Sequence, residues 1–350
     1  MKIGIPREIK ILEGRVALTP SATRELVKQG HEVFVQSGAG LLSGYPDQDY
    51  VNAGVSLLNS AQALYDAAQV VVKVKEPQPA ELNYLRKDHI LFSYLHLAAE
   101  PDLTQELLKI GLTAIAFETV SKNHQLPLLA PMSDIAGRIA VQIGSHLLHQ
   151  PQGGRGVLLG GIPGTEKGQV VILGGGTAGH SATQVASALG AHVLVFEPNR
   201  DKQVQLEEIG QNVTAIQPFE QDIAKAVKEA DLLIGAVLIR GAKTPHLVSA
   251  ELVKTMQAGS VIIDISVDQG GCIETTHPTT YENPTFIWEN VIHFGVTNMP
   301  GAVPRTSTQA LSAALLPYVS QLCEADWQLN PALVSGINLQ NGEIKLQTLI

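Results

Sequence analysis

The chain is poor in cysteine and lacks a hydrophobic run long enough to cross a membrane. Its 350 residues contain two cysteines, Cys272 and Cys323, which are too few for a disulfide framework or a cysteine-based zinc site. No uninterrupted apolar run approaches the roughly 18 residues of a membrane span. The charges at Lys2, Arg7 and Glu8 leave no room for an apolar export segment near the N-terminus. We therefore expect inert thiols, a reducing cytoplasmic location and no metal site.

The chain also lacks an excess of basic residues. It carries 24 Lys and Arg against 33 Asp and Glu, which gives a formal net charge of -9 at pH 7. Sequence-independent binding to nucleic acid or anionic lipid requires clustered Lys and Arg. We therefore expect no nucleic-acid or membrane partner, and small molecules or further copies of the chain as partners.

Length and patterning predict two α/β domains. The chain exceeds the length that one hydrophobic core usually serves. Short apolar runs alternate with amphipathic segments of helix length in two series, and this pattern builds parallel sheets covered by helices on both faces. The expected strands are 2–6, 31–36, 70–75, 90–95 and 113–118 in the first series, and QVVILGGG, AHVLVFE, ADLLIGAVL, SVIIDIS and IHFGVTN in the second.

Segments outside the two series complete the expected organisation. An apolar residue recurs every four positions within 130–150, which predicts one long connecting helix. The residues after position 300 read as helical with no strand nearby and are expected to return to the first domain. The glycine-rich stretch 153–164 predicts a hairpin with tight turns. The predicted domains are 1–129 with 300–350, which is discontinuous, and 130–299.

The segment 170–202 carries a dinucleotide-binding pattern. Gly174, Gly176 and Gly179 satisfy G-x-G-x-x-G, which is weak alone because the chain has 32 glycines. Here an apolar strand precedes the pattern, and a helix with one apolar face and a further strand follow it. The first glycine permits a tight turn, the second lets the backbone approach a pyrophosphate, and the third lets the helix pack on the strand. Thr177 and Ala178 would offer backbone N–H groups to the phosphates.

An acidic residue at the end of the next strand favours NAD over NADP as cofactor. Glu197 follows the glycines at nearly the expected offset, and its carboxylate can accept hydrogen bonds from both ribose hydroxyls while repelling a 2′-phosphate. Arg200 and Lys202 temper this preference, because either side chain could reach a phosphate.

Cationic side chains gather at strand ends in the first series. Lys75 ends one expected strand and His96 ends the next, so two parallel strands would bring an ammonium and an imidazole to one edge of the sheet, where ligands bind in such folds. Lys73 shares its face of the strand with Lys75, and the sequence does not decide which lysine serves chemistry. Arg15 lies between the first strand and the first helix, on the same side of the sheet, and its guanidinium suits a substrate carboxylate.

A carboxylate lies at a strand end in the second series. Asp268, in VIIDISVDQGGC, comes just after the strand, and Gly270 and Gly271 let the backbone turn sharply. By spacing alone Asp264 is an equal candidate, although its place within the apolar run suggests a structural role.

These motifs together resemble those of the alanine dehydrogenases, in the alanine dehydrogenase/transhydrogenase alpha-subunit family. The resemblance runs through GIPRE, RVALTP, VKVKEP, LHLAA, LLAPMS, GGTAG, GAVL, DQGGC and TNMPGAVPRTST, and covers nearly the whole chain. It implies two Rossmann-like, doubly wound parallel-sheet domains with an interdomain cleft. The discontinuous domain would bind substrate, the other domain would bind NAD, and the chain would form a homo-oligomer, commonly a hexamer.

The resemblance also assigns roles to residues. Arg15 and Lys75 match the substrate-binding pair, His96 the proton-transfer residue and Asp268 the second catalytic residue, so Lys73 becomes the less favoured lysine. Many relatives have aspartate where this chain has Glu197, which shifts the ribose geometry slightly. Met132 and Asn298 match the pyruvate pocket, and Ser133, Thr177, Ala178, Glu197, Lys202, Val237, Leu238 and Met299, with Asp268 and Asn298 again, match cofactor contacts.

The implied activity is the reversible oxidative deamination of L-alanine to pyruvate and ammonia with NAD, a step of amino-acid catabolism. Two other functional classes share the two-domain pattern. One is the soluble NAD(H)-binding component of a proton-translocating transhydrogenase, in which we expect no histidine at the position of His96. The other is an amino-acid dehydrogenase of the lysine or opine type. Apart from these two enzyme-related classes, a non-catalytic NAD-binding protein is a further alternative.

Overall fold

The computed structural model describes residues 1–237 and 244–346, which form two compact units. Unit 1 consists of Met1–Met132 together with Gly301–Ile350, and unit 2 of Ser133–Pro300. The first unit is therefore built from both ends of the chain. The boundaries fall at 132/133 and 300/301, next to the expected positions 129/130 and 299/300.

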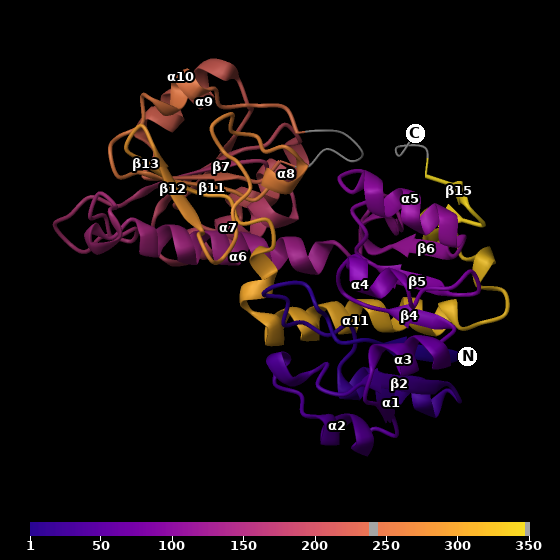
Figure 1. The fold of residues 1–350 in the computed structure, drawn as a ribbon. Coiled ribbons are helices and arrows are strands. Elements are labelled where there is room, and N and C mark those ends of the chain that lie inside the picture. Colours follow the sequence, from indigo (N-terminus) through magenta and orange to yellow (C-terminus); the bar gives the residue numbers. More distant parts are fainter. Residues whose placement is uncertain (238–243, 347–350) are drawn as a thin grey trace. The chain divides into compact units, whose positions relative to one another are not determined.

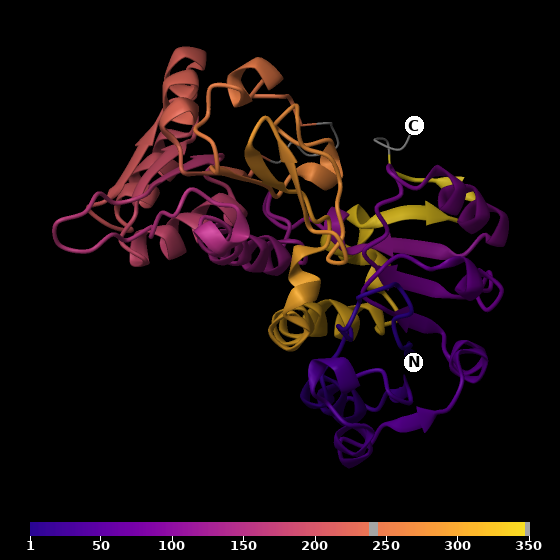
Figure 2. The same ribbon diagram turned by 60° about the vertical axis from the view of Figure 1, so that its left-hand side comes forward.

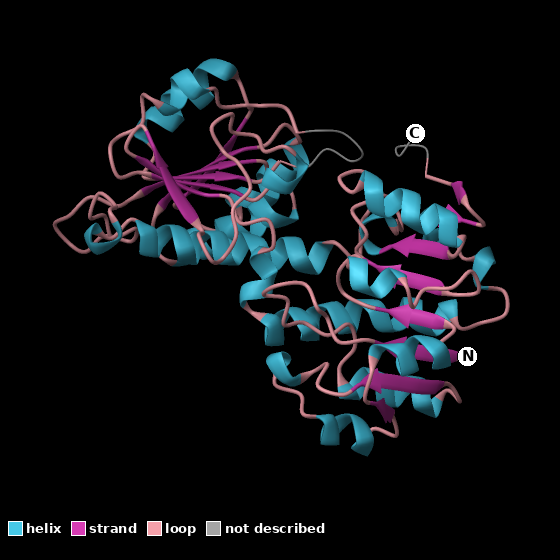
Figure 3. Cartoon of the chain, viewed as in Figure 1, coloured by secondary structure: helices cyan, strands magenta, loops and turns pink. Residues whose placement is uncertain are grey.

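Unit 1 contains an eight-stranded sheet in the order β15-β14-β6-β5-β4-β1-β2-β3. The six strands from β6 to β3 pair in parallel, while β14 pairs antiparallel with β6 and with β15. The stacked strands and the helices beside them are visible in Figure 3. The strands are β1 (Lys2–Ile5), β2 (Glu32–Gln36), β3 (Ser56–Leu58), β4 (Val70–Val72), β5 (Ile90–Ser93), β6 (Thr113–Ala116), β14 (Ile337–Gln340) and β15 (Glu343–Ile344).

The helices of unit 1 begin with local capping signals. In α1, the Thr19 side chain accepts a hydrogen bond from the Ala22 N–H and Pro20 occupies the first turn, a combination that satisfies an exposed donor and presets the backbone. The helices are α1 (Pro20–Lys28), α2 (Asp47–Asn52), α3 (Ala61–Ala67), α4 (Pro79–Leu82), α5 (Pro101–Ile110), α11 (Pro304–Leu322) and α12 (Pro331–Ser335).

Helix α11 returns to the first unit and fixes the loop between β1 and α1. Thr308 accepts a hydrogen bond from the Val16 N–H at 3.1 Å, and Ser312 accepts one from the Thr19 N–H at 3.0 Å. Strand β14, later in the same C-terminal segment, lies beside β6, as the yellow and purple strands of Figure 2 show. The C-terminal segment thus supplies both a strand and hydrogen-bond partners to the N-terminal part of the chain.

Unit 2 contains a seven-stranded sheet in the order β12-β13-β11-β10-β7-β8-β9, parallel except for the antiparallel pair of β12 and β13. Helices α9 and α10 lie on one side of this sheet and α6 and α7 on the other (Figure 1). The strands are β7 (Gln169–Leu173), β8 (His192–Phe196), β9 (Val213–Ile216), β10 (Leu232–Gly235), β11 (Val261–Asp264), β12 (Thr285–Trp288) and β13 (Val291–Phe294). The helices are α6 (Ala130–Leu147), α7 (Thr177–Ala188), α8 (Arg200–Glu207), α9 (Glu220–Glu229) and α10 (Ala250–Val253).

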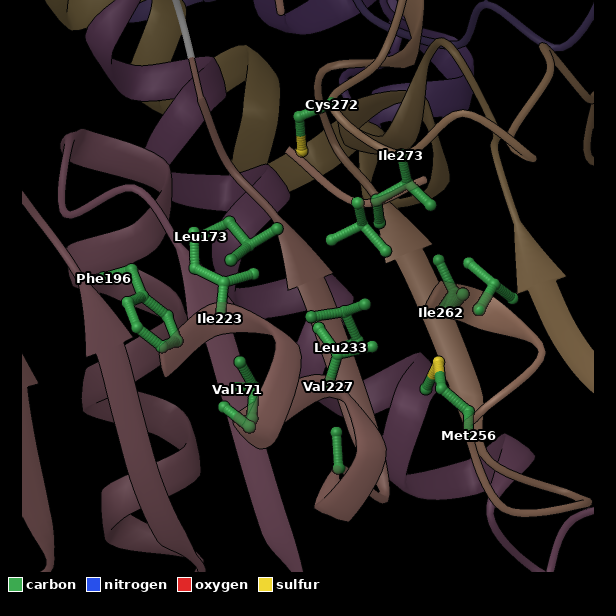
Figure 4. Packing of buried hydrophobic residues seen from close by; sticks show 14 of the residues in the cluster. Val171, Leu173, Phe196, Ile223, Val227, Leu233, Met256, Ile262, Cys272 and Ile273 are labelled. Atoms are coloured by element: carbon green, nitrogen blue, oxygen red, sulfur yellow. The ribbon is translucent and has the colours of Figure 1, made fainter. Parts of the chain in front are cut away.

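One hydrophobic cluster of unit 2 lies between the sheet and helix α9. Val171, Leu173 and Leu233 from the strands pack against Val227 of α9 and Ile273, all fully buried. Figure 4 shows these side chains beneath the strand ends, with Cys272 at the same end of the sheet. Burial of such apolar side chains, worth roughly 1.5–3 kcal/mol each, stabilises the sheet that carries the glycine-rich turn.

The α/β fold class expected from the sequence is confirmed, but the sheets are mixed and not parallel throughout. Every expected strand and the long helix near 130–150 are present. The sequence reading missed β3, β9, β12, β14 and β15, which are short or lie at sheet edges.

The hairpin expected at 153–164 is wrong, because these residues form turns with no strand pair. Their glycines instead let the chain pass close to other elements. A Cβ at Gly154 would lie 2.1 Å from the carbonyl oxygen of Leu147, and one at Gly160 would lie 2.1 Å from that of Leu189. Within the described ranges, every helix is too short or too polar to span a bilayer.

Candidate active site

Arg15 is buried and held by a carboxylate from its own loop. Its side chain is 2% exposed, and Nε and Nη2 donate to Glu13 at 2.7 and 2.5 Å. Burial opposes the positive charge, but the hydrogen bonds and charge of Glu13 outweigh it, so the pKa of Arg15 is raised. Nη1 faces the Met132 sulfur at 3.1 Å. The structure therefore brings two residues assigned to the substrate pocket, Arg15 and Met132, into contact within unit 1.

Lys75 lies after the end of β4 and is buried near Arg15. The side chain is 9% exposed. Burial lowers its pKa, and the positive charge of Arg15 lowers the pKa further, which the neighbouring Glu76 only partly opposes. An amine of lowered pKa beside a guanidinium provides positive charge and a proton donor for an anionic substrate. The strand itself ends at Val72, so both lysines lie in the segment that follows it.

Lys73 does not share this environment. Its side chain is fully buried and its ammonium pairs with Glu8 at 3.2 Å and Glu81 at 3.1 Å. Burial alone would lower the pKa of Lys73, but the two carboxylates raise it, so the amine stays charged. A fully buried ammonium between two carboxylates is a structural arrangement and fits the lesser role given to Lys73.

His96 has an uncommon backbone conformation. Its φ is 49°, in the left-handed region that non-glycine residues seldom adopt. Glu118 holds this conformation by accepting hydrogen bonds from the His96 N–H at 2.7 Å and the Leu95 N–H at 3.2 Å. The imidazole, which is partly exposed, stacks on the Tyr94 ring at 6.0 Å. Strained backbone held by its surroundings is frequent at functional sites.

Tyr94 stacks on the His96 ring and lies close enough to Arg15 for the guanidinium charge to act on its phenol. Burial raises the pKa of its phenol, and the positive charge of Arg15 opposes this shift. Its hydroxyl donates to the Leu128 carbonyl at 2.5 Å. Unit 1 thus places Arg15, Lys75 and the Tyr94–His96 stack in one region, at the ends of neighbouring strands. Neither Tyr94, Glu13 nor Glu118 was found from the sequence, because their roles depend on contacts that no local motif signals.

The glycine-rich turn of unit 2 has the geometry that its spacing predicts. Gly174 has a φ of 96°, and a Cβ at Gly179 would lie 1.8 Å from the Gly174 carbonyl oxygen. Both positions therefore require glycine for the turn itself. Gly176 differs, because a Cβ there would meet no atom within 4 Å. Its missing side chain leaves space in front of the α7 N-terminus, where Thr177 and Ala178 begin the helix. This open cradle fits a dinucleotide pyrophosphate.

Helix α6 packs closely on this turn. A Cβ at Gly137 would lie 2.1 Å from the Ala178 carbonyl oxygen, and Asp134 accepts a hydrogen bond from Ser181 of α7 at 2.6 Å. Gly137 was not singled out from the sequence. Ser133 is the first residue of unit 2 and lies in the first turn of α6.

Glu197 lies against the glycine-rich turn at the end of β8. Its Oε2 accepts a hydrogen bond from the Gly175 N–H at 2.8 Å and its Oε1 one from the Asn199 N–H at 2.9 Å. Each carboxylate oxygen has two lone pairs, so both can also accept from a ribose hydroxyl. Arg200 and Lys202 are exposed on α8.

Asp264 and Asp268 occupy different environments. Asp264, the last residue of β11, is fully buried, and its carboxylate accepts hydrogen bonds from the N–H groups of Ser266, Cys272 and Ile273 at 2.9, 2.9 and 3.2 Å. Asp268 is exposed in a short 3-10 turn, Val267–Gln269, within the loop that Asp264 closes. The structure therefore separates a structural carboxylate from an accessible one, which the spacing alone did not.

The remaining predicted contacts lie at strand ends of unit 2. Val237 follows β10, where the backbone of 236–237 lies against Gly174. Asn298 and Met299 follow β13, with Met299 buried and its carbonyl accepting a hydrogen bond from Tyr281 at 2.8 Å. Leu238 lies outside the described residues. In the part of the chain that the structure describes, no three His, Cys, Asp or Glu side chains gather as around a metal ion.

The chain folds into two α/β units. One of them has a glycine-rich strand–turn–helix and an acidic residue at the end of the next strand, which defines a protein of the Rossmann-type dinucleotide-binding class. Comparison with family models is specific. The model described as alanine dehydrogenase/PNT, N-terminal domain, matches residues 4–136, and the corresponding C-terminal domain model matches residues 140–347. The chain belongs to the alanine dehydrogenase/PNT family.

Individual relatives match over the full length. Alanine dehydrogenase of Bacillus subtilis is 49% identical over 358 residues, covering 100% of this chain and 94% of that protein. Alanine dehydrogenase of Methanococcus maripaludis is 48% identical over 356 residues, with 100% and 95% coverage. A solved L-alanine dehydrogenase structure matches with a TM-score of 0.95 and 50% identity, covering 100% of this chain and 98% of the other.

A solved transhydrogenase structure from Sinorhizobium meliloti has a TM-score of 0.84 at 23% identity, covering 99% of both chains. At this identity it shows a shared fold alone.

Proposed function

We propose that the chain catalyses the reversible, NAD-dependent oxidative deamination of L-alanine: L-alanine, NAD⁺ and water give pyruvate, ammonium, NADH and a proton. The observation that carries the proposal is the buried pair of cations, Arg15 and Lys75, at the strand ends of unit 1, in a chain whose whole length matches alanine dehydrogenases. A guanidinium and an amine suit the two oxygen-bearing groups of pyruvate, its carboxylate and its C2 carbonyl.

Arg15 binds the substrate carboxylate in this proposal. Glu13 holds the Nε side of the guanidinium and thereby directs Nη1 toward Met132, a residue that the family resemblance assigns to the pyruvate pocket. A fixed guanidinium loses little freedom when the carboxylate binds, which strengthens recognition. Lys75 then donates to the C2 oxygen and polarises it.

His96 and Asp268 move protons. The His96 imidazole takes a proton from the hydroxyl of the carbinolamine intermediate or returns it there. Asp268 holds the ammonium group or takes its proton. The family resemblance assigns Asn298 to the substrate pocket. This division of the proton transfers among Lys75, His96 and Asp268 is itself a prediction.

NAD, when bound, supplies the acceptor for the hydride from substrate C2. The residues that would hold it are the backbone of Gly174, Gly176, Thr177, Ala178 and Gly179 at the pyrophosphate and Glu197 at the ribose, because Gly176 leaves open space and Glu197 Oε2 bonds to the Gly175 N–H of this turn. Further contacts are expected from Ser133, Lys202, Val237, Asp268, Asn298 and Met299. A carboxylate at the ribose disfavours the 2′-phosphate of NADP.

The oligomeric and cellular predictions remain part of this proposal. A homo-oligomer, commonly a hexamer, and a cytoplasmic location are what the family resemblance and the composition lead us to expect. Sedimentation of the purified protein measures its oligomeric state directly.

The proposal is tested by NADH formation from L-alanine, with glycine, L-serine and L-lysine for comparison. We expect L-alanine to be the best substrate. His96→Ala should reduce turnover at least about 100-fold, the usual contribution of a positioned acid or base, and leave the dissociation constant for NADH unchanged. His192→Ala, at an exposed position at the start of β8, is the control and should behave as the wild type.

Near-normal turnover in His96→Ala would end the assignment of His96. Faster reaction with L-lysine would favour a dehydrogenase of the lysine type. No NADH formation with any of the four amino acids would favour the transhydrogenase component.

A further inference from the structure

Lys73, which lies two positions before the proposed substrate-binding residue Lys75, bonds to more than its two carboxylate partners. Besides Glu8 and Glu81, the Lys73 ammonium donates to the carbonyl oxygens of Lys75 at 3.0 Å and Glu76 at 3.4 Å. Its whole side chain is fully buried. The ammonium therefore holds the backbone of the segment that carries Lys75.

Glu8 holds the same segment from its N–H side. Its Oε1 accepts hydrogen bonds from the Val74 N–H at 2.6 Å and the Lys75 N–H at 3.4 Å, while its Oε2 accepts from Lys73. Both backbone polar groups of Lys75 are thus bound by one buried ion pair. We call Lys73, Glu8 and Glu81 the buried triad.

The buried triad lies where the strand pairing changes. Strand β4 pairs with β1 only at Val70 and Val71, whereas on its other side the chain still bonds to β5 as far as Val74, whose carbonyl accepts from the Tyr94 N–H at 3.1 Å. Beyond Val71 the Glu8 side chain, from the loop after β1, replaces a neighbouring strand. The segment of Lys75 is therefore shaped by side chains and not by a sheet ladder.

From this arrangement we propose that Lys73, acting with Glu8, is a positioning residue that fixes the backbone of Lys75 and so aims its amine at the substrate. The inference rests on the proposed function, in which Lys75 contacts the C2 oxygen. It also gives Lys73 a task that stability alone does not explain, because apolar residues of similar volume commonly stabilise a core as well as a buried ion pair does. Supporting residues of this kind keep a site within the narrow geometry that reaction requires.

The loop between β1 and α1 serves both cations in this way. Glu8 binds the backbone of Lys75, and Glu13 binds the side chain of Arg15. The two carboxylates lie near enough for Glu13 to raise the pKa of Glu8, although burial is the larger cause. One loop thereby sets the positions of the amine and the guanidinium relative to each other.

The experiment compares Lys73→Met and Glu8→Gln with Tyr65→Phe in the full-length protein. Tyr65 donates to Glu81 at 2.8 Å on the far side of the buried triad, so Tyr65→Phe disturbs the same cluster without touching the Lys75 backbone. For Lys73→Met and Glu8→Gln we expect the KM for pyruvate to rise at least about 10-fold, with a smaller change in kcat. The dissociation constant for NADH should stay at the wild-type value in all three variants.

A second readout does not depend on activity. Hydrogen exchange of a peptide spanning residues 73–78, followed by mass spectrometry, should become at least about 10-fold faster in Lys73→Met and Glu8→Gln and stay unchanged in Tyr65→Phe. Glu8→Gln keeps the length and one acceptor oxygen, so it serves if Lys73→Met fails to fold.

The inference would be overturned if Glu8→Gln kept both the wild-type KM for pyruvate and the wild-type hydrogen exchange of residues 73–78. It would also be overturned if Tyr65→Phe changed these two quantities as much as Glu8→Gln does. If the wild type forms no NADH from L-alanine, the proposed function fails, while the exchange result still shows whether the buried triad holds this segment.

Discussion

Asp264 illustrates at the scale of one residue how a buried carboxylate can shape a loop and make its stability depend on pH. It accepts three backbone hydrogen bonds from both limbs of the loop that carries Asp268. Burial raises the pKa of Asp264 from 3.8 to about 6, opposed by the bonds from Ser266, Cys272 and Ile273 and assisted slightly by the charge of Asp268. The nearby Cys272 thiol has a pKa raised above its usual value, so it stays neutral across this range.

We predict that this carboxyl makes the protein less stable as pH rises from about 4 to about 6. In that window the folded state keeps a proton that the unfolded state has released, so the free energy of unfolding falls with pH. A shift of about two units corresponds to on the order of 3 kcal/mol. Denaturant unfolding of wild type and Asp264→Asn at pH 4 and pH 6.5 measures the fall in the free energy of unfolding between the two pH values. This fall should be smaller in the variant by on the order of 3 kcal/mol. Equal falls in both proteins would contradict the prediction.

At the scale of elements, the β7–α7 turn separates glycines needed for folding from one left for a ligand. Gly179 is crowded, with Gly174 1.8 Å from its would-be Cβ, whereas Gly176 is open and has a φ of -68° that any residue adopts. The two positions belong to the same motif, but close backbone packing requires glycine at position 179, whereas at position 176 the open space is available to a ligand.

We predict opposite outcomes for alanine at these two positions. Gly179→Ala should destabilise the protein by about 3 kcal/mol or more, because the backbone must move. Gly176→Ala should change stability by less than about 0.5 kcal/mol and weaken NADH binding at least about 10-fold, since its methyl group fills the expected pyrophosphate space. Thermal unfolding and fluorescence titration with NADH measure the two effects. NADH binding by Gly176→Ala at wild-type strength would show that the open space is not the pyrophosphate site.

At the scale of the whole molecule, the first unit depends on both ends of the chain and the second does not. Strand β14 completes the unit 1 sheet beside β6, and Thr308 and Ser312 of α11 accept hydrogen bonds from the loop that carries Arg15. Unit 2 is one continuous segment, Ser133–Pro300. The C-terminal family model nevertheless extends to residue 347, across the segment that folds with unit 1.

We predict that a chain ending at Pro300 keeps a folded unit 2 and loses unit 1. The truncated sheet would expose β6 as a bare edge and leave buried backbone N–H groups without acceptors. Limited proteolysis should therefore cut within residues 1–132 and spare 133–300, and NADH binding should persist within about threefold. Protease resistance of residues 1–132 without the C-terminal segment would refute this dependence.

Much of the fold could be predicted because its signals are local. Alternating apolar runs and amphipathic segments predicted the α/β class, the main strands and α6, and the combined motifs predicted the family, all of which are confirmed. Strand β14 escaped because its four residues, INLQ, have no apolar run and pair with β6 more than 200 positions away. The roles of the site residues stay predictions.

The sequence by itself determined where the main strands, the long helix α6 and the glycine-rich turn form, because backbone preferences and side-chain periodicity act over a few residues. Only the tertiary structure decided which lysine is a structural one and which carboxylate closes a loop. Lys73 and Lys75 are two positions apart and chemically identical, yet Glu8 and Glu81 surround the first and Arg15 adjoins the second. Burial and charge around a side chain are set by residues distant in the chain, and those are what distinguish the two.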